Sequence, residues 1–232
     1  MEKKALSHYK AMILAAGRGN RLRPLTDQLP KPLMDIHGQA LIEYHLHALS
    51  RAGIDQVVIN HAWLGQKIEA ALGTGEAYQI EITYSPEPEG GLETAGGILQ
   101  ALPLLTDGNQ PFLVVNGDVF TDFDFSALAK STLPEGCLAH LILVPTPSFK
   151  AQGDFGLDKE GKVLATGDYT FSGISLLHPD LFSGITPGFV PLAPVLRDAI
   201  HQGKVTGEVY SGRWDDIGTI ERLETARENG LN

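Results

Sequence analysis

The chain has 232 residues, of which 28 are Asp or Glu and 18 are Lys or Arg, so its formal net charge is −10; 43% of the residues are hydrophobic. This composition excludes a disordered chain and argues against a broad basic surface for nucleic acid. The one cysteine, Cys137, excludes an internal disulfide framework, and no apolar run reaches the roughly 20 residues of a membrane helix. We therefore expect a protein of the reducing cytoplasm, with no signal peptide and no nucleic-acid or membrane partner.

The first half of the chain alternates short apolar runs with helical patterns. This alternation is typical of βαβ units stacked around a mostly parallel sheet. Strands are predicted over residues 10–16, 56–60, 79–84 and 111–115. Helices are predicted over residues 41–52, 64–72 and 94–102. The Pro-, Gly- and Glu-rich stretch 85–97 predicts a long functional loop.

After about residue 125 the strands follow one another with fewer helices. The predicted strands cover residues 138–144, 155–157, 162–165 and 169–177, and the predicted helices cover 191–202 and 219–229. There is no repeat at a fixed period and no charge-rich linker. We therefore expect one domain over residues 1–232, with a mixed sheet in its second half.

The charge is unevenly distributed along the chain. Residues 1–31 hold seven basic side chains and two acids, whereas residues 68–129 contain no Lys or Arg and ten acids. An acidic protein with one basic corner favours a small anionic ligand at that corner. The alternative for Lys3, Lys4 and Lys10 is a solvated N-terminal tail.

A glycine- and arginine-rich segment, AAGRGNRLRPLT, follows the first predicted strand. Glycines let backbone amides approach phosphate oxygens, and arginines add forked, charged donors. The segment therefore predicts a phosphate-binding loop, with a tight strand-to-helix turn as the alternative. Leu22 breaks the dinucleotide fingerprint, which argues against an NAD-dependent dehydrogenase, and no Walker-type loop occurs. The residues assigned to phosphate binding are Ala15, Ala16, Gly17, Arg18, Gly19, Asn20 and Arg21.

Two further positions carry chemistry suited to phosphate and metal. Lys31 stands between two prolines and is either a second phosphate contact or an exposed loop residue. Asp118 follows the apolar strand 111–115, where a carboxylate is well placed to bind Mg²⁺, although it could simply be a turn residue. A second acid is needed from elsewhere, and Asp215 and Asp216 are the candidates.

Four motifs in this order resemble the sugar-1-phosphate nucleotidyltransferases: GRGNRLRPLT, Pro30-Lys31-Pro32-Leu33, Val115-Asn116-Gly117-Asp118 and Trp214-Asp215-Asp216-Ile217-Gly218-Thr219. The usual signature has Thr where this chain has Asn20. The resemblance implies a Rossmann-like fold, with a nucleotide-binding half at about 10–125 and a sugar-binding half at about 126–232. It further implies no C-terminal β-helix, because the chain ends soon after its last predicted helix.

The resemblance also implies roles for individual residues. Arg21, Lys31 and Asp118 would be catalytic, Mg²⁺ would lie between Asp118 and Asp216, and Gly91 and Gly117 would join the nucleotide-binding loop. Sugar contacts are predicted from chemistry at Glu93, Asp154, Gly173 and again Gly117, because carboxylates and free amides bind hydroxyl groups. The alternatives are a helix cap for Glu93 and a turn for Asp154.

The implied reaction joins a nucleoside triphosphate and a sugar 1-phosphate and releases pyrophosphate. Segments 58–64, 92–98, 153–155 and 171–174 are most similar to members that use UTP and N-acetylmuramate α-1-phosphate in cell-wall sugar recycling. Guanylyl transfer to mannose 1-phosphate, thymidylyl or uridylyl transfer to glucose 1-phosphate, and a non-catalytic sugar-nucleotide sensor remain alternatives. The sequence does not indicate an oligomeric state.

Overall fold

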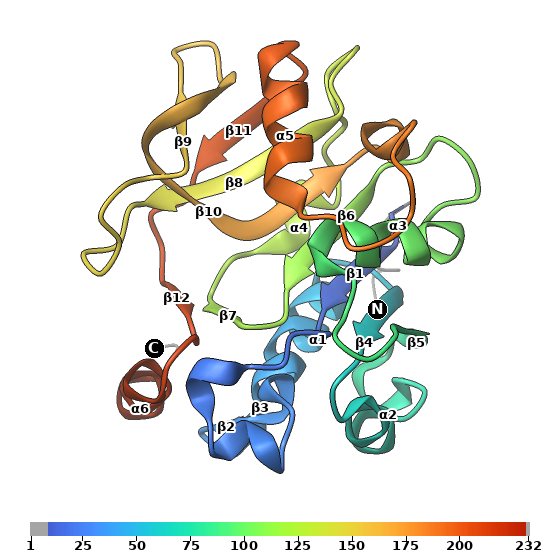
Figure 1. The fold of residues 1–232 in the computed structure, drawn as a ribbon, viewed down its shortest axis with the longest axis vertical. Coiled ribbons are helices and arrows are strands. Elements are labelled where there is room, and N and C mark those ends of the chain that lie inside the picture. Colours follow the sequence, from blue (N-terminus) through green and yellow to red (C-terminus); the bar gives the residue numbers. More distant parts are fainter. Residues whose placement is uncertain (1–8, 231–232) are drawn as a thin grey trace, which may run out of the picture.

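The computed structural model describes residues 9–230. Its main feature is an eight-stranded sheet in the order β11-β8-β10-β6-β1-β4-β5, with β9 added on β10 (Figure 1). β1 is parallel to β4 and β6, β4 is parallel to β5, and β10 is antiparallel to β6, β8 and β9. The strands are β1 (Ala11–Leu14), β4 (Gln56–His61), β5 (Glu81–Pro86), β6 (Phe112–Asn116), β8 (Ala139–Pro145), β9 (Phe155–Leu157), β10 (Val163–Leu177) and β11 (Val205–Val209).

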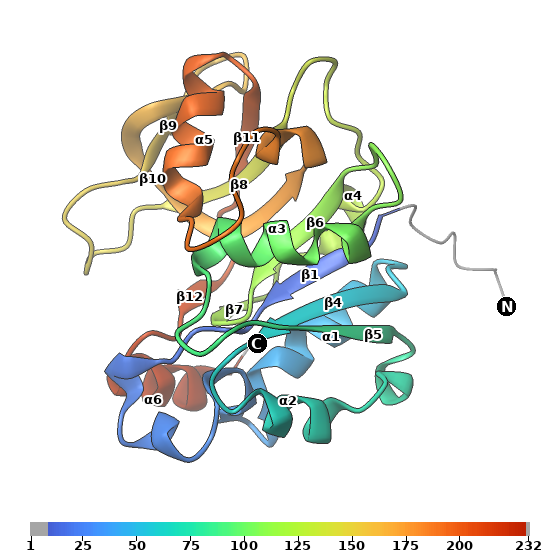
Figure 2. The same ribbon diagram turned by 45° about the vertical axis from the view of Figure 1, so that its right-hand side comes forward.

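Helices cover both faces of this sheet (Figure 2). Successive side chains of β1 point to opposite faces: Ala11 and Ile13 belong to an apolar cluster with residues of α1, α2 and α4, whereas Met12 belongs to a second cluster with residues of α3 and α5. Burial of a large apolar side chain such as Met12 or Ile13 stabilises the fold by roughly 1.5–3 kcal/mol. The helices are α1 (Leu41–Arg51), α2 (Gly65–Leu72), α3 (Glu93–Leu105), α4 (Phe125–Leu128) and α5 (Leu192–His201).

Every predicted strand and helix is present, but the structure adds short elements that were not predicted, and two further differences lie in the second half. The predicted strands 162–165 and 169–177 are one strand, β10, which has a bulge between Phe171 and Ile174. β11 was not predicted. Its sequence VTGEV contains Gly207, which weakens the strand pattern, but a Cβ there would lie 2.8 Å from the carbonyl oxygen of Leu141, so the close pairing with β8 requires glycine.

The C-terminal segment returns to the N-terminal half. β12 (Trp214–Asp216) pairs antiparallel with β7 (Val119–Thr121), and α6 (Ile220–Asn229) follows. Leu223 and Ala226 of α6 pack against Leu22, Met34 and Ile36 in a third apolar cluster. The return brings the late Trp-Asp-Asp motif beside the strand end at Asp118. The short elements of this region are η1 (Asn20–Leu22), η2 (Leu25–Asp27), η3 (Lys31–Leu33), β2 (Asp35–Ile36) and β3 (Gln39–Ala40); η4 (Glu76–Tyr78) and η5 (Pro179–Phe182) lie elsewhere.

No helix within residues 9–230 is long and apolar enough to cross a membrane. The division into a nucleotide-binding and a sugar-binding half stays a prediction; in the structure one continuous sheet joins the two, because β6 pairs with β10. Lys3 and Lys4 lie outside the described residues.

Candidate active site

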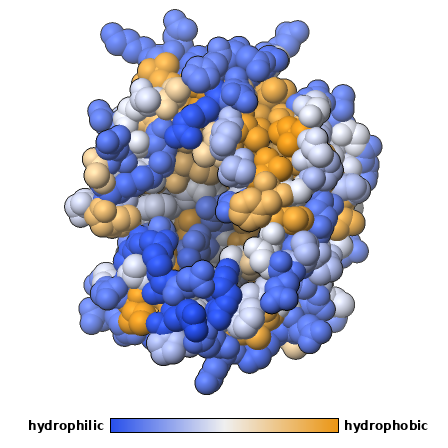
Figure 3. Space-filling model, in the orientation of Figure 1, coloured by the Kyte–Doolittle hydropathy of each residue, from blue (hydrophilic) through white to orange (hydrophobic). Residues whose placement is uncertain are grey.

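Two adjoining pockets open where β1, β4 and β6 end. The large pocket has a volume of about 1050 Å³ and the small pocket about 580 Å³. Figure 3 shows the hollow between the two halves of the molecule. The pockets share five lining residues, Arg21, Glu93, Thr94, Asn116 and Asp118. Ligands in the two pockets would therefore meet at these residues.

The glycine-rich loop after β1 forms one wall of the large pocket. Gly19 has φ +69°, and a Cβ on it would lie 2.8 Å from Thr26 Cγ2. The Thr26 hydroxyl donates to the Gly19 carbonyl at 2.9 Å, which fixes the loop in this shape. The amide of Ala15 already donates to Asn60 Oδ1 at 2.8 Å, so it is not free to donate to a phosphate oxygen. This hydrogen bond instead holds the start of the loop against β4.

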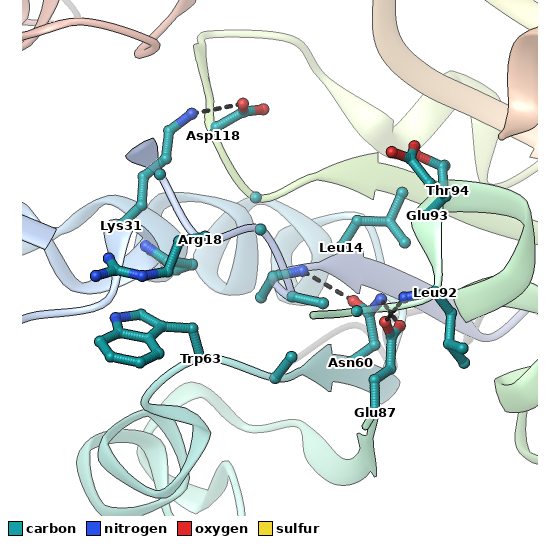
Figure 4. Close-up of a pocket in the computed structure, with 18 of the residues that line it drawn as sticks. Leu14, Arg18, Lys31, Asn60, Trp63, Glu87, Leu92, Glu93, Thr94 and Asp118 are labelled. Atoms are coloured by element: carbon teal, nitrogen blue, oxygen red, sulfur yellow. Dashed lines mark hydrogen bonds and ion pairs between the residues drawn. The ribbon is translucent and has the colours of Figure 1, made fainter. Parts of the chain in front are cut away.

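The arginines of the loop differ in what they bind. Arg18 donates to the Thr26 carbonyl and to Asp27 Oδ1, and its guanidinium lies 3.7 Å from the centre of the Trp63 ring (Figure 4). It therefore braces the loop. Arg21 lines both pockets and makes no hydrogen bond or ion pair within the described part of the chain. Arg21 is thus the arginine of this loop that is available for an anion.

Gly218, in the late motif, makes room for Arg21. A Cβ on Gly218 would lie 2.8 Å from an Arg21 guanidinium nitrogen and 3.0 Å from Asp216 Oδ1. The Ile-Gly-Thr part of the motif therefore keeps the Arg21 guanidinium close to the Asp216 carboxylate.

Lys31 and Asp118 meet at the boundary of the two pockets. Lys31 Nζ lies 2.6 Å from Asp118 Oδ2, and the Lys31 side chain is only 12% exposed (Figure 4). Asp118 is held at the end of β6 by Gly117, whose amide donates to the Leu14 carbonyl at 2.9 Å. A Cβ on Gly117 would lie 2.7 Å from that same oxygen, so only glycine allows this approach.

Asp216, and not Asp215, faces the small pocket. The Ile217 amide donates to the Asp118 carbonyl at 2.9 Å, which sets the register between β12 and β7. Side chains alternate along a strand, so Asp216 lines the small pocket while Asp215 pairs with Arg213 at 3.4 Å and lines neither pocket.

The acids at this place suit a hard cation. Asp216 Oδ1 is buried and has no hydrogen-bond partner among the described residues, whereas Oδ2 accepts from Arg222 at 3.0 Å. Mg²⁺ typically binds one or two protein carboxylates and completes its shell with water and phosphate oxygens. Asp118 and Asp216 fit this pattern, and residues 9–230 hold no group of three or more His, Cys, Asp or Glu arranged around a metal.

The predicted sugar contacts are placed differently from one another. Glu93 lines both pockets with φ +60°, a strained value for a residue with a side chain, and it makes no helix-cap hydrogen bond. Asp154 lines the small pocket, where it accepts from Lys150 and from the Phe171 amide. Gly173 lines neither pocket. A Cβ on Gly173 would lie 2.7 Å from Cγ of Asn116, so the two residues are in close contact. Gly91 lines the large pocket.

Sequence reasoning missed a polar chain that ties the loop 85–92 to the glycine-rich loop. Glu87 accepts from Asn60 Nδ2 at 2.6 Å and from the Leu92 amide at 2.8 Å, and Asn60 in turn accepts from Ala15 (Figure 4). Asn116, which lines both pockets, was likewise not among the predicted site residues. Asn60 and Asn116 could have been recognised from their place in the sequence, because both lie near the carboxyl ends of predicted parallel strands. Ligands bind at that edge of such sheets.

His45 of α1 is buried and interacts electrostatically with Asp118. Burial lowers its pKa to about 4, against the opposing effects of a hydrogen bond to the Val119 backbone and of the Asp118 charge. In the unfolded chain His45 binds a proton as the pH falls below about 6.5, whereas in the folded chain it does so only near pH 4. The free energy of unfolding therefore decreases as the pH is lowered from about 6.5 to 4. We expect a loss of about 2 kcal/mol from this residue between pH 7 and pH 5.

Urea unfolding of the wild type and of His45→Gln at the two pH values would measure this loss. The variant should be less stable at pH 7 but lose less stability on acidification. Equal pH dependence of the two proteins would contradict the prediction.

Comparison with known proteins identifies the class. The profile of the nucleotidyl transferase family matches residues 10–165, and the chain belongs to this family. A Bacillus anthracis protein crystallised with sucrose, described as a candidate glucose-1-phosphate thymidylyltransferase, superposes with a TM-score of 0.85 at 21% identity over 96% of this chain and 95% of its own. HddC from Yersinia pseudotuberculosis gives a TM-score of 0.77 at 21% identity, covering 95% and 98%. The predicted α/β fold with a mostly parallel, mixed sheet is confirmed.

Proteins similar in sequence include several sugar-1-phosphate nucleotidyltransferases. N-acetylmuramate α-1-phosphate uridylyltransferase of Neisseria meningitidis serogroup B is 55% identical over 225 residues, covering 94% of this chain and 96% of its own. The Caulobacter vibrioides protein of the same name is 32% identical, covering 90% and 91%. UTP–glucose-1-phosphate uridylyltransferase of Synechocystis is 30% identical, covering 84% of this chain and 52% of its own. The predicted resemblance to sugar-1-phosphate nucleotidyltransferases is confirmed.

Proposed function

We propose that the protein transfers a uridylyl group from UTP to N-acetylmuramate α-1-phosphate and releases pyrophosphate. The observation that carries the reaction type is the junction of the two pockets, where Arg21, Lys31 and Asp118 lie between a large and a small cavity. The substrate pair rests on the name of the Neisseria relative, which is 55% identical over nearly the whole chain. A role in cell-wall sugar recycling, in the cytoplasm, is part of the same proposal.

The reaction is a displacement at phosphorus. An oxygen of the sugar phosphate forms a bond to the α-phosphorus, and the bond from that phosphorus to the β-phosphate oxygen breaks, so pyrophosphate leaves. A phosphate monoester has its second pKa near ~6 and is mostly ionised at neutral pH, so no general base is required. The barrier comes from bringing two anions together in line.

The basic side chains of the site address this repulsion. Arg21 is unpaired within the described residues and can donate to phosphate oxygens from the boundary of the pockets. Lys31 pairs with Asp118 and lies where its ammonium can neutralise charge that moves toward the leaving pyrophosphate. The Arg18–Asp27 pair and the Asn60–Glu87 chain keep the loops in place before substrate binds.

Mg²⁺ is proposed as the cofactor, held by Asp118 and Asp216. When bound, it would neutralise phosphate oxygens and withdraw electrons from the reacting phosphorus. The buried, unpartnered oxygen of Asp216 supports this assignment.

A panel assay tests the proposed reaction. Purified protein is incubated with Mg²⁺ and each of UTP, GTP, dTTP, CTP and ATP, paired with the 1-phosphates of N-acetylmuramate, mannose, glucose and N-acetylglucosamine, and pyrophosphate is measured. The highest kcat/KM is expected for UTP with N-acetylmuramate α-1-phosphate. A higher value for another pair would replace the substrates proposed here. Binding of UDP-sugars without turnover of any pair would favour the sensor.

Glu93 offers a test of the sugar contacts. A carboxylate that accepts a hydrogen bond from a sugar hydroxyl contributes about 1.5–3 kcal/mol, so Glu93→Gly should raise KM for the sugar phosphate roughly 10- to 100-fold. Because glycine adopts φ +60° freely, the variant should be as stable as the wild type or slightly more stable. Steady-state kinetics and thermal melting measure the two effects. A destabilised variant with unchanged KM would instead indicate a structural role.

A further inference from the structure

Two of the basic side chains in the small pocket make no ion pair among residues 9–230, and one of these two lines no other pocket. Its basic side chains are Arg21, Lys150, Arg197 and Arg222. Lys150 pairs with Asp154 at 2.5 Å, and Arg222 pairs with Asp216 at 3.0 Å. Arg197 makes no ion pair or hydrogen bond among the described residues, and Arg21 lies at the boundary with the large pocket. Arg197 is therefore the free positive charge that belongs to the small pocket alone.

The position of Arg197 follows from α5. Leu192 and Ala193 line the small pocket, and so do Leu196 and Arg197 one turn later. Residues four apart share a face of a helix, so this face of α5 is turned toward the pocket. The exposed Arg197 guanidinium lies 5.7 Å from the centre of the Phe155 ring, a cation–π contact that leaves its hydrogen-bond donors free.

The surroundings of Arg197 combine this charge with apolar surface. Leu192, Leu196, Phe155 and Phe171 line the pocket beside it. Arg222 and Asp216, by contrast, belong to the C-terminal segment, which descends away from α5 (Figure 1). The small pocket thus has one end at Asp118 and Asp216 and a second end with an apolar wall, the Arg197 guanidinium and the Lys150–Asp154 ion pair.

N-acetylmuramate fits this second end chemically. It differs from N-acetylglucosamine by a lactyl ether on O3, which carries a methyl group and a carboxylate that is ionised at neutral pH. A substituent on O3 leaves the ring away from the phosphate on C1. We propose that Arg197 binds the lactyl carboxylate while the leucine and phenylalanine side chains contact the lactyl methyl group. This inference rests on the proposed function and names a residue that determines its acceptor specificity.

The test compares two acceptors that differ only at the lactyl carboxyl group, which is ionised in N-acetylmuramate α-1-phosphate and is neutral and one methyl group larger in its lactyl methyl ester, both with UTP and Mg²⁺. A charge-assisted bond contributes enough for the wild type to prefer the acid roughly 10- to 100-fold in kcat/KM. Arg197→Gln should lose most of this preference while KM for UTP stays unchanged. Arg197→Lys, which keeps a charge but not the fork, should show an intermediate preference.

Lys150→Gln is the matched control, since Lys150 lines the same pocket but is already paired with Asp154. It should keep the preference for the acid. If Arg197→Gln discriminates between acid and ester as the wild type does, or if Lys150→Gln is the variant that loses discrimination, the assignment to Arg197 is overturned. If the wild type turns over neither acceptor, the proposed function itself fails. Circular dichroism and UTP binding confirm that each variant is folded.

Discussion

Asp118→Asn is expected to lower kcat by about 10²- to 10³-fold, the loss typical when one preorganised electrostatic group is removed from an active site. The substitution keeps the size of the side chain but removes the negative charge that lies 2.6 Å from Lys31 and faces both pockets. Under the proposed function it also removes half of the carboxylate pair for Mg²⁺. The remaining activity should require a higher Mg²⁺ concentration than the wild type does.

The measurement is kcat against Mg²⁺ concentration for both proteins, with EDTA as the metal-free control. The Lys31 side chain is 12% exposed and that of Asp118 34%, so the pair is partly buried, but the amide oxygen of an asparagine can still accept a hydrogen bond from the Lys31 ammonium. The loss of stability should therefore be about 1–2 kcal/mol. Thermal melting should therefore differ by only a few degrees. An unchanged kcat would contradict a role of Asp118 in the reaction, and full wild-type activity in EDTA would contradict the metal requirement.

The sequence predicts most of the sheet because its central strands are nearly all apolar. β1 and β6 are buried on both faces, and such runs are recognisable without knowledge of their neighbours. β7, β11 and β12 were missed for the opposite reason. β7 and β12 have three residues each, and β11 has Gly207 at its centre. Each is stabilised by a partner remote in sequence, as in the pairing of Asp216 with Val119. No local pattern contains that information.

The same distinction applies to the site. Lys31 and Asp118 were predicted from motifs, and the structure brings them into contact although they are far apart in the chain. Arg18 was assigned to phosphate on the same grounds, but its side chain stacks on Trp63 and pairs with Asp27. Which arginine of a loop stays free depends on such partners, and a motif cannot specify them. Arg197 carried no motif at all, and only its place in the small pocket makes it a candidate.

The second large effect concerns the neighbouring acids of β12, which form a matched pair. Asp216→Asn should lower kcat by about 10²- to 10³-fold, because this carboxylate faces the small pocket and has a buried oxygen without a partner in the described structure. Asp215→Asn removes the same charge one residue earlier and should change kcat less than twofold, because Asp215 lines neither pocket. The two variants have the same net charge, so any long-range electrostatic effect is similar in both.

Binding of Mn²⁺, followed by electron paramagnetic resonance in the presence of a non-hydrolysable UTP analogue, separates a metal ligand from a residue that acts in another way. Asp216→Asn should weaken Mn²⁺ binding at least about tenfold, and Asp215→Asn should leave it unchanged. If Mn²⁺ binding is unchanged in Asp216→Asn while kcat falls, the acid acts by orienting Arg222, with which it pairs at 3.0 Å, or Arg21 beside Gly218. If Asp215→Asn lowers kcat more than Asp216→Asn does, the assignment of the catalytic acid from the alternation of side chains along β12 is wrong.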